Sequence, residues 1–160
     1  SAKLGFFEVE QPLVGELLNI LAAGEIDMTL FFRELASVQA DRLEAEDLLS
    51  KTSYQKLTNE QIHSLEVWLK KYSDEIRNQN IDDQARVDLM NRTNPLYVFR
   101  NYIAQLAIDD AEKGDYSMVD ELLDVFRRPY QEQSGKARFA EKRPDWARTR
   151  VGCSMLSCSS

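Results

Sequence analysis

The sequence contains few of the residues that define several large protein classes. Its 160 residues include one histidine, two cysteines, six glycines and four prolines. So little glycine and proline excludes collagen-like and other Gly/Pro-rich low-complexity architectures. No apolar run approaches the roughly 20 residues that a helix needs to cross a bilayer. We therefore expect no transmembrane segment and no membrane partner.

The scarce residues also limit the chemistry that this chain can perform. Phosphate-binding loops need closely spaced glycines, so that backbone N–H groups can approach the oxygens, and here the glycines are too widely scattered along the chain. The single histidine, His63, has no cysteine near it, which excludes a zinc site of the His/Cys type. One histidine also excludes a four-helix carboxylate bundle with two Glu-x-x-His pairs. A Ser-His-Asp arrangement stays open, although no nucleophile elbow supports it.

From these limits we predict no catalytic, cofactor-binding or metal-binding residue in this chain. His63 is interpreted as a partly exposed residue without a chemical role.

The charge is acidic overall and unevenly distributed. The formal net charge is −7, which argues against a nucleic-acid partner, because phosphate binding needs a basic surface. Residues 1–126 carry a net charge of −12, whereas residues 127–160 contain eight basic and three acidic residues, a net charge of +5. This pattern predicts a basic tail that is attracted to its own acidic body or to another acidic surface, such as a further domain.

Both cysteines, Cys153 and Cys158, lie in the last eight residues. Disulfide-stabilised secreted domains distribute their cysteines through the fold, so we expect packing to hold the body together in a reducing compartment. The first five residues contain neither an initiator methionine nor a secretory signal, and we interpret this end as a cut end of a longer protein. Whether Ser1-Ala2 is a tag remnant stays open.

Apolar residues recur at helical spacing through most of the chain. The first predicted helix begins at Pro12 and ends at Gly24, where a positive φ is expected. Further helices are predicted after the caps Asp27, Thr58, and Asp82 or Asp83, with a short piece over residues 43–49. A long helix is expected from Asn94-Pro95 to Gly114, followed by one from Ser117 to Pro129 and a possible turn at residues 136–142.

No stretch shows sustained strand alternation, so the predicted fold is all-α. We expect an irregular bundle of about five to seven helices with an extended C-terminal tail. The predicted domains are a helical domain over residues 1–130 and a basic, mostly irregular tail over residues 131–160. Aromatic residues at helical spacing are assigned to the core, namely Phe31, Phe32, Trp68, Tyr97, Phe99, Tyr102 and Phe126.

The expected long helix contains two polar features with a candidate role, Arg100 and the pair Asp109-Asp110. Arg100 lies among bulky apolar residues, and we predict that its planar guanidinium fixes the geometry between helices rather than binding substrate. Asp109 and Asp110 lie near a helix end, where the dipole opposes negative charge. Lys113 can offset one of these charges. We interpret the pair as a solvated face, with a binding surface as the alternative.

Several ordered motifs in the last third of the chain resemble one family. The sequence reads Asn-Pro-Leu-Tyr-Val-Phe-Arg-Asn-Tyr from Asn94, and continues with Arg-Pro-Tyr at residues 128–130 and Arg-Pro-Asp-Trp-Ala at residues 143–147. It ends in Ser-Cys-Ser-Ser. This succession resembles the C-terminal end of the selenoprotein O family, closely over residues 94–160 and more loosely over residues 1–93.

The resemblance implies that the parent protein is a protein adenylyltransferase. Members of the family have a protein-kinase-like domain that binds ATP in an inverted orientation and transfers AMP to protein hydroxyl side chains with divalent metal ions. None of the ATP-binding or metal-binding elements of that site maps onto this chain. The resemblance therefore implies ATP and Mg²⁺ for the parent, an inactive fragment here, and a bacterial cytoplasmic location. The implied partners are an upstream kinase-like domain and the parent's protein substrates.

One functional residue is carried over by the resemblance. Selenocysteine stands third from the end in eukaryotic members and cysteine in most bacterial members, and here that position is Cys158. The family pattern implies redox control, in which a disulfide ties this end to the catalytic domain. Cys153 is the second candidate thiol. The spacing also permits a short internal disulfide, and two reduced thiols without a role are a further reading.

A second function stays open beside the adenylyltransferase interpretation. A stand-alone helical interaction module would bind a peptide or a partner helix in an exposed apolar groove. The adenylyltransferase interpretation expects the upstream domain to cover such a groove.

Overall fold

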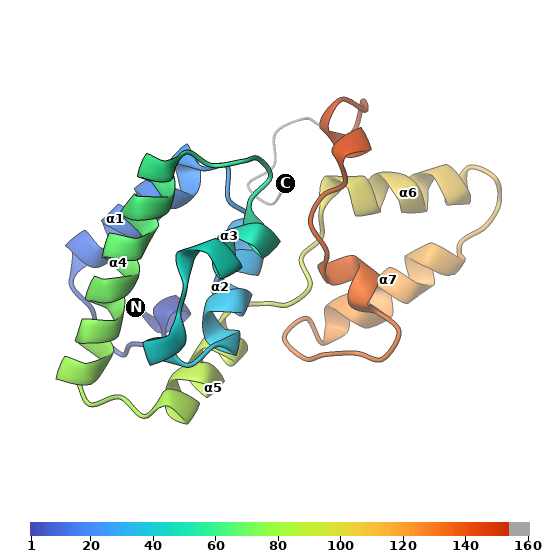
Figure 1. Ribbon diagram of the computed structural model, residues 1–160. Helices are drawn as coiled ribbons and strands as arrows, with labels where there is room; N and C mark the ends of the chain where they lie inside the picture. The colour runs from blue at the N-terminus through green and yellow to red at the C-terminus, as the bar shows by residue number, and fades with distance from the viewer. Residues whose placement is uncertain (154–160) are drawn as a thin grey trace. The chain divides into compact units, whose positions relative to one another are not determined.

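The computed structural model describes residues 1–153, which contain seven α-helices, four short 3₁₀ helices and no β-strand (Figure 1). The all-α prediction is therefore confirmed. The α-helices are α1 (Gln11–Ala23), α2 (Met28–Ser37), α3 (Ala45–Thr52), α4 (Asn59–Asn78), α5 (Asp83–Thr93), α6 (Asn101–Ala111) and α7 (Ser117–Arg127). The 3₁₀ helices are η1 (Ala2–Leu4), η2 (Ala40–Arg42), η3 (Ala137–Ala140) and η4 (Asp145–Arg148).

The chain forms two compact units, Ser1–Asn94 and Pro95–Ser160. The division at residue 130 that composition and charge predict stays a prediction. In the structure, the segment after α7 packs on α6 and α7. The backbone N–H groups of Leu96 and Tyr97 both donate to the carbonyl of Pro129, at 2.8 and 3.0 Å. Phe139, Ala147 and Cys153 are buried in the same core as these helices.

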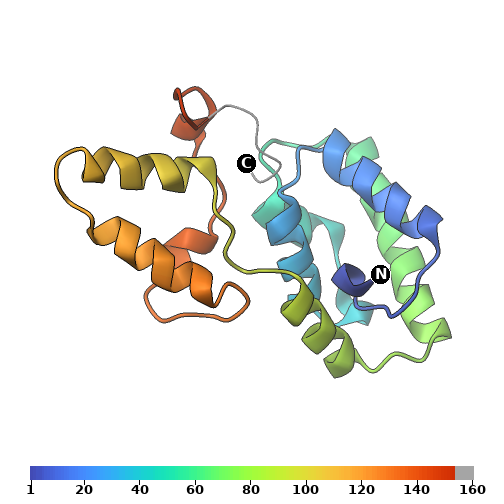
Figure 2. The same cartoon turned by 180° about the vertical axis from the view of Figure 1, so that it is seen from behind.

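In the first unit, α1 and α4 lie side by side in both views (Figures 1 and 2). They run antiparallel, because Trp68 Nε1 donates to the carbonyl of Leu13 at 2.8 Å and Gln61 Nε2 donates to that of Ala23 at 2.9 Å. Thr58 and Gln61 form the predicted capping box at the start of α4. The cap fixes where the helix begins and hence which of its faces meets α1.

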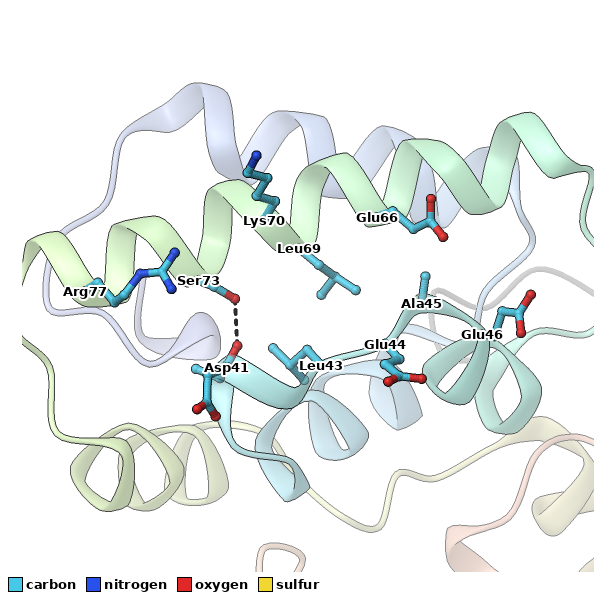
Figure 3. A pocket seen from close by; sticks show the side chains of 11 residues that line it. Asp41, Leu43, Glu44, Ala45, Glu46, Glu66, Leu69, Lys70, Ser73 and Arg77 are labelled. Carbon is cyan, nitrogen blue, oxygen red and sulfur yellow. Dashed lines mark hydrogen bonds between the residues drawn. The ribbon is translucent and has the colours of Figure 1, made fainter.

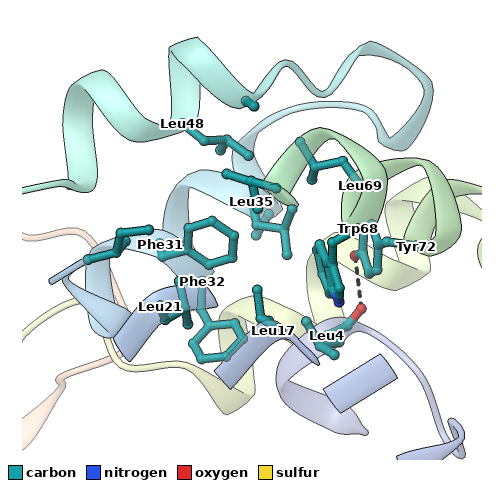
Figure 4. Packing of buried hydrophobic residues seen from close by; sticks show 14 of the residues in the cluster. Leu4, Leu17, Leu21, Phe31, Phe32, Leu35, Leu48, Trp68, Leu69 and Tyr72 are labelled. Atoms are coloured by element: carbon teal, nitrogen blue, oxygen red, sulfur yellow. Dashed lines mark hydrogen bonds between the residues drawn. The ribbon is translucent and has the colours of Figure 1, made fainter. Parts of the chain in front are cut away.

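The core of the first unit is built on the apolar stripe of α4 (Figure 4). Leu65, Trp68, Leu69, Tyr72 and Ile76 lie on one face of the helix, and each is at most 5% exposed. The Trp68 and Tyr72 rings stack with centroids 5.1 Å apart. Aromatic pairs of this kind add to the free energy gained by burying apolar surface, so this stripe forms the centre of the unit.

A buried arginine ties α5 to its neighbours, which the sequence did not predict. The Arg86 side chain has no exposed surface and donates to the carbonyls of Leu35 and Val38, at 3.0 and 2.6 Å. It also donates to the Tyr72 hydroxyl at 3.3 Å and pairs with Asp83 at 2.7 Å. The planar guanidinium can satisfy several acceptors at once, so a single side chain links α2, α4 and α5.

In the second unit, α6 and α7 form an antiparallel hairpin. Gly114 has φ +87°, and the N–H of Asp115 donates to the carbonyl of Asp110 at 3.0 Å. This is the helix-ending geometry that glycine favours, so the predicted stop at Gly114 is confirmed. The core of this unit includes Tyr102, Ile103, Leu122 and Val125, together with Cys153.

The predicted start of the long helix at Asn94-Pro95 is wrong. Asn94 instead ends α5, where its N–H donates to the carbonyl of Met90 at 2.8 Å. Its side-chain Nδ2 donates to the carbonyl of Lys3 at 2.9 Å. Residues 95–100 are not helical, and α6 begins at Asn101. A residue that looks like a local cap is used for a contact 91 positions away in the sequence.

Two smaller expectations also differ from the structure. Phe99 was assigned to the core, but it lies before α6 and is 55% exposed. Gly24 does end α1, but with φ −91°, and the positive φ of 46° belongs to Glu25. Glycine is suited to position 24 because a Cβ there would lie 3.0 Å from the Ile26 side chain.

Candidate functional site

The described part of the chain ends at Cys153, so Cys158 lies outside the described residues. Cys153 is a free thiol with no exposed surface, packed in the core of the second unit. Reactive cysteines are at least partly exposed, whereas a buried cysteine behaves as a small apolar side chain. Cys153 is therefore assigned a packing role in the core of the second unit.

The segment before Cys153 is held on α6 by contacts that we call the C-terminal anchor, formed by residues 145–153. Arg150 pairs with Asp109, and its guanidinium also lies 5.6 Å from the centre of the Trp146 ring. Trp146 meets Tyr102 edge to face, with ring centroids 6.2 Å apart. Charge, cation–π and aromatic contacts thus combine at one helix face.

Gly152 brings the backbone of the anchor against α6. A Cβ at this position would lie 2.2 Å from Oε1 of Gln105, and the residue has φ +87°. Both the space and the backbone conformation favour glycine. The close approach places Cys153 in the core.

On α6, the carboxylate of Asp109 forms the ion pair with the C-terminal anchor. Gln105 Nε2 donates to it at 2.9 Å, and this hydrogen bond, followed by the contact with Arg150, lowers the pKa of the Asp109 carboxyl. Lys113 lies 3.2 Å from Asp110, as predicted. The two adjacent aspartates therefore have different partners. Asp109 pairs with Arg150 of the C-terminal anchor, and Asp110 pairs with Lys113.

Basic residues of the tail also pair with α7. Lys136 lies 2.7 Å from Glu121, and Arg138 contacts the same carboxylate. The hydrogen bond from Lys136 is the main cause of a lowered pKa of Glu121. These contacts show the basic tail attracted to acidic residues within the second unit.

The other two polar residues singled out in the sequence, His63 and Arg100, lie in different environments. The His63 side chain is 74% exposed and lies 3.3 Å from Glu66 on the same helix. Arg100 is 3% exposed and is the N-cap residue of α6.

A polar pocket of about 500 Å³ lies in the first unit, between α4 and the segment from η2 to α3 (Figure 3). Leu43 and Leu69 contribute apolar surface, and the charged residues are Asp41, Glu44, Glu46, Glu66, Lys70 and Arg77. The Ser73 hydroxyl donates to the carbonyl of Ala40 at 2.6 Å. Because this hydroxyl, the only one in the lining, donates to a backbone carbonyl, the structure shows no side-chain base activating it as a nucleophile.

A second hollow, of about 350 Å³, lies along α6 and α7 and is almost entirely apolar. We call it the apolar groove, lined by Phe99, Ala104, Ala107, Ile108, Ala111, Val119, Leu122, Leu123 and Phe126. Phe99, Ile108 and Leu123 are 55, 50 and 56% exposed. Apolar periodicity predicts that these residues lie in the core, and it does not show that part of this surface is exposed. The sequence signal that could have indicated this surface is the adjacent pair Leu122 and Leu123, on a helix that also buries Val125. Large apolar residues at these positions cannot all lie on one helix face.

Within residues 1–153, no three His, Cys, Asp or Glu side chains are grouped so that they could hold a metal ion. No helix in this range is long and apolar enough to span a membrane.

Comparison with known proteins connects the chain to one family. The family model described as Protein adenylyltransferase SelO matches residues 1–127. The protein nucleotidyltransferase YdiU of Azoarcus sp. (strain BH72) is 47% identical over 165 residues, which cover 100% of this chain and 31% of the relative. The proteins of the same name from Rhodopirellula baltica and Tolumonas auensis are 46% and 44% identical, over 96% and 100% of this chain. The chain spans 31% of the length of these relatives.

Proposed function

This chain belongs to the SelO family of protein adenylyltransferases, and on that premise we propose that it is the C-terminal helical region of an enzyme that transfers AMP from ATP to hydroxyl side chains of proteins. The observation that carries this proposal is the identity of 47% over the whole chain with a relative named as a protein nucleotidyltransferase. The reaction is assigned to the part of the relatives' length that this chain does not span. That part is also the proposed partner of the helical region, in a bacterial cytoplasmic enzyme that modifies protein substrates.

The described residues do not fit ATP or Mg²⁺. No two glycines are close enough in the sequence for a phosphate-binding loop, and Gly114, with its positive φ, closes a helix hairpin. Residues 1–153 contain no group of three acidic, histidine or cysteine side chains suited to a metal ion. No step of AMP transfer is therefore assigned to a residue of this chain.

The proposed role of the helical region is to support the catalytic part and to present Cys158 for redox control. Cys158 follows Cys153 by five residues, and five extended residues span at most about 18 Å. Because Cys153 is packed in the second unit, the covalent chain limits where the Cys158 sulfur can react. Its thiol and a thiol of the catalytic part would form a disulfide by losing two electrons and two protons to an oxidant such as oxidised glutathione.

Two measurements on purified protein test this function. In the full-length enzyme, Cys158→Ser should abolish the difference in AMP transfer between oxidised and reduced samples, whereas Ser157→Ala should leave it unchanged. A redox dependence that survives in Cys158→Ser contradicts the proposed control. Titration calorimetry of the 160-residue chain should detect no ATP binding, and saturable binding would show that the active site is placed wrongly.

The apolar groove favours a second candidate function, a helical module that binds a partner protein. Grooves of this kind accept the apolar face of an amphipathic helix. The two functions differ in the full-length protein, where the module requires the groove to stay accessible and the supporting role requires it to be covered.

A further inference from the structure

The apolar groove leaves large hydrophobic side chains exposed to solvent. Phe99, Ile108 and Leu123 are each at least half exposed, and they line a single hollow. Scattered apolar residues on a surface need no explanation, whereas a contiguous patch marks an interaction site. Three large side chains around one apolar hollow form such a patch.

The described residues of the second unit do not fill this groove. The residues that close the core after α7, namely Phe139, Ala147 and Cys153, pack in the cluster with Tyr102 and Ile103. None of these five residues lines the groove. Within the described residues, the groove is therefore left open.

A second copy of the chain fits the groove poorly. A stable complex between separate chains buries at least about 1,000 Å² in total, and this groove is formed by nine residues, several of them alanine. Each chain also carries a formal charge of −7, so two copies repel each other. A tethered segment needs far less surface, because the effective concentration of a linked partner reaches the millimolar range. The relatives are about three times as long as this chain, which leaves ample polypeptide to supply such a segment.

The rim of the groove indicates the chemistry of the occupant. Glu112 follows Ile108 by four positions and Asp120 precedes Leu123 by three, so both border the groove on the helix surface. Both residues are exposed, and neither carboxylate forms an ion pair with another described residue. The end of the groove nearest the α6–α7 turn is therefore acidic.

We propose that the apolar groove is the docking surface for an amphipathic helix from the remaining two thirds of the same polypeptide, with bulky apolar residues at helical spacing and a Lys or Arg facing Glu112 and Asp120. This proposal rests on the proposed function, because that function places the remainder of the enzyme on the same chain. The groove would then be the surface at which the helical region supports the catalytic part.

Site-resolved thiol labelling tests the docking. Leu123→Cys is labelled with a maleimide in the 160-residue chain and in the full-length protein, and modification is followed by peptide mass spectrometry. Val67→Cys is the matched control, because Val67 is 43% exposed on α4 and lies outside the groove. We expect the thiol introduced at position 123 to react at least tenfold more slowly in the full-length protein, with less than a twofold change at position 67. Equal rates at position 123 overturn the proposal.

Two further outcomes are decisive. Protection of position 123 that grows with the concentration of the 160-residue chain identifies a second copy as the occupant and overturns the proposal. In the full-length protein, the double variant Glu112→Lys, Asp120→Lys should raise the labelling rate at position 123 several-fold, while Glu60→Lys on α4 should not. If Leu123→Cys does not fold, slowed hydrogen exchange at the α7 amides of the unmodified full-length protein serves as the readout, and unchanged exchange contradicts docking.

Measuring AMP transfer by the same full-length sample separates this proposal from the proposed function. Protection without AMP transfer means that docking holds and the assigned activity fails. AMP transfer without protection means that the activity holds and the groove is not the docking surface.

Discussion

Arg86 and Asp83 form a salt bridge across one turn at the start of α5, with Nε and Oδ1 2.7 Å apart. The arginine side chain is fully buried, whereas the aspartate is 37% exposed. The charge of the guanidinium is thus balanced at the edge of the core, while its other N–H groups satisfy carbonyls on α2 and its C-terminal loop. The pair fixes how α5 meets the rest of the first unit.

Replacing the buried arginine should strongly destabilise the first unit. Arg86→Ala leaves the carbonyls of Leu35 and Val38 and the Tyr72 hydroxyl without this donor and opens a cavity, and we expect a loss of about 3–5 kcal/mol in the free energy of unfolding. Arg86→Lys should lose less, because the ammonium retains the charge but not the planar geometry. Urea unfolding followed by circular dichroism measures both. Equal stability of Arg86→Ala and the unmodified chain would contradict the role of this contact.

A methyl group at Gly152 should displace the Gln105 side chain and loosen the C-terminal anchor. Gly152→Ala introduces a Cβ that would lie 2.2 Å from Gln105 Oε1, at φ +87°. Gly114→Ala is the matched control, because Gly114 has the same φ and no atom within 4 Å of the added Cβ. Both variants should lose about 1 kcal/mol from backbone strain.

Only Gly152→Ala should also move Gln105 and weaken its hydrogen bond to Asp109, so that maleimide modification of the Cys153 thiol accelerates about two- to threefold in peptide-resolved mass spectrometry. A similar acceleration in Gly114→Ala would show that strain alone, and not the contact with Gln105, opens the anchor.

The stability of the second unit should depend on the ionisation of Glu121. The hydrogen bond from Lys136 lowers the pKa of this carboxyl below its ordinary value of 4.5. Because the pKa is lower in the folded state, the contact stabilises the unit above the unfolded-state pKa and is lost as the pH falls through the folded-state pKa. The unmodified chain should therefore lose more stability than Glu121→Gln when the pH falls from about 6 to about 3. Denaturant unfolding at several pH values tests this, and parallel curves would contradict it.

Local sequence signals predicted helix starts where the cap acts within one turn. Asp27 accepts the N–H of Leu30 at 3.0 Å, and Asp82 accepts that of Ala85 at 2.9 Å, as their positions before apolar stripes indicated. Asn94 carried the same signal, yet its side chain contacts Lys3 and its backbone ends α5. That outcome depends on a residue 91 positions away, which no local pattern contains.

Burial was predictable for the long stripe of α4 but not for the hairpin of α6 and α7. The apolar seam predicted for this helix comprises Ile62, Leu65, Leu69, Tyr72 and Ile76, and all of these except the partly buried Ile62 are buried. In α7, apolar residues occupy more than one face, and which of them is covered depends on what packs against it. Val125 belongs to a buried core that also includes residues of the segment after α7. Leu123, by contrast, is 56% exposed.

The amino-acid sequence alone determined the helical class, most of the helix boundaries, the absence of glycine-rich loops and the acidic character of the chain, because each depends on residue types and short spacings. Tertiary structure alone decided that Arg86 is buried, that the carboxylate of Asp109 holds the C-terminal anchor, that Cys153 lies in a core and that the apolar groove stays open. These features depend on contacts between elements that are far apart in the sequence. Each such contact must both bury apolar surface and give hydrogen-bond partners to the polar groups that it covers.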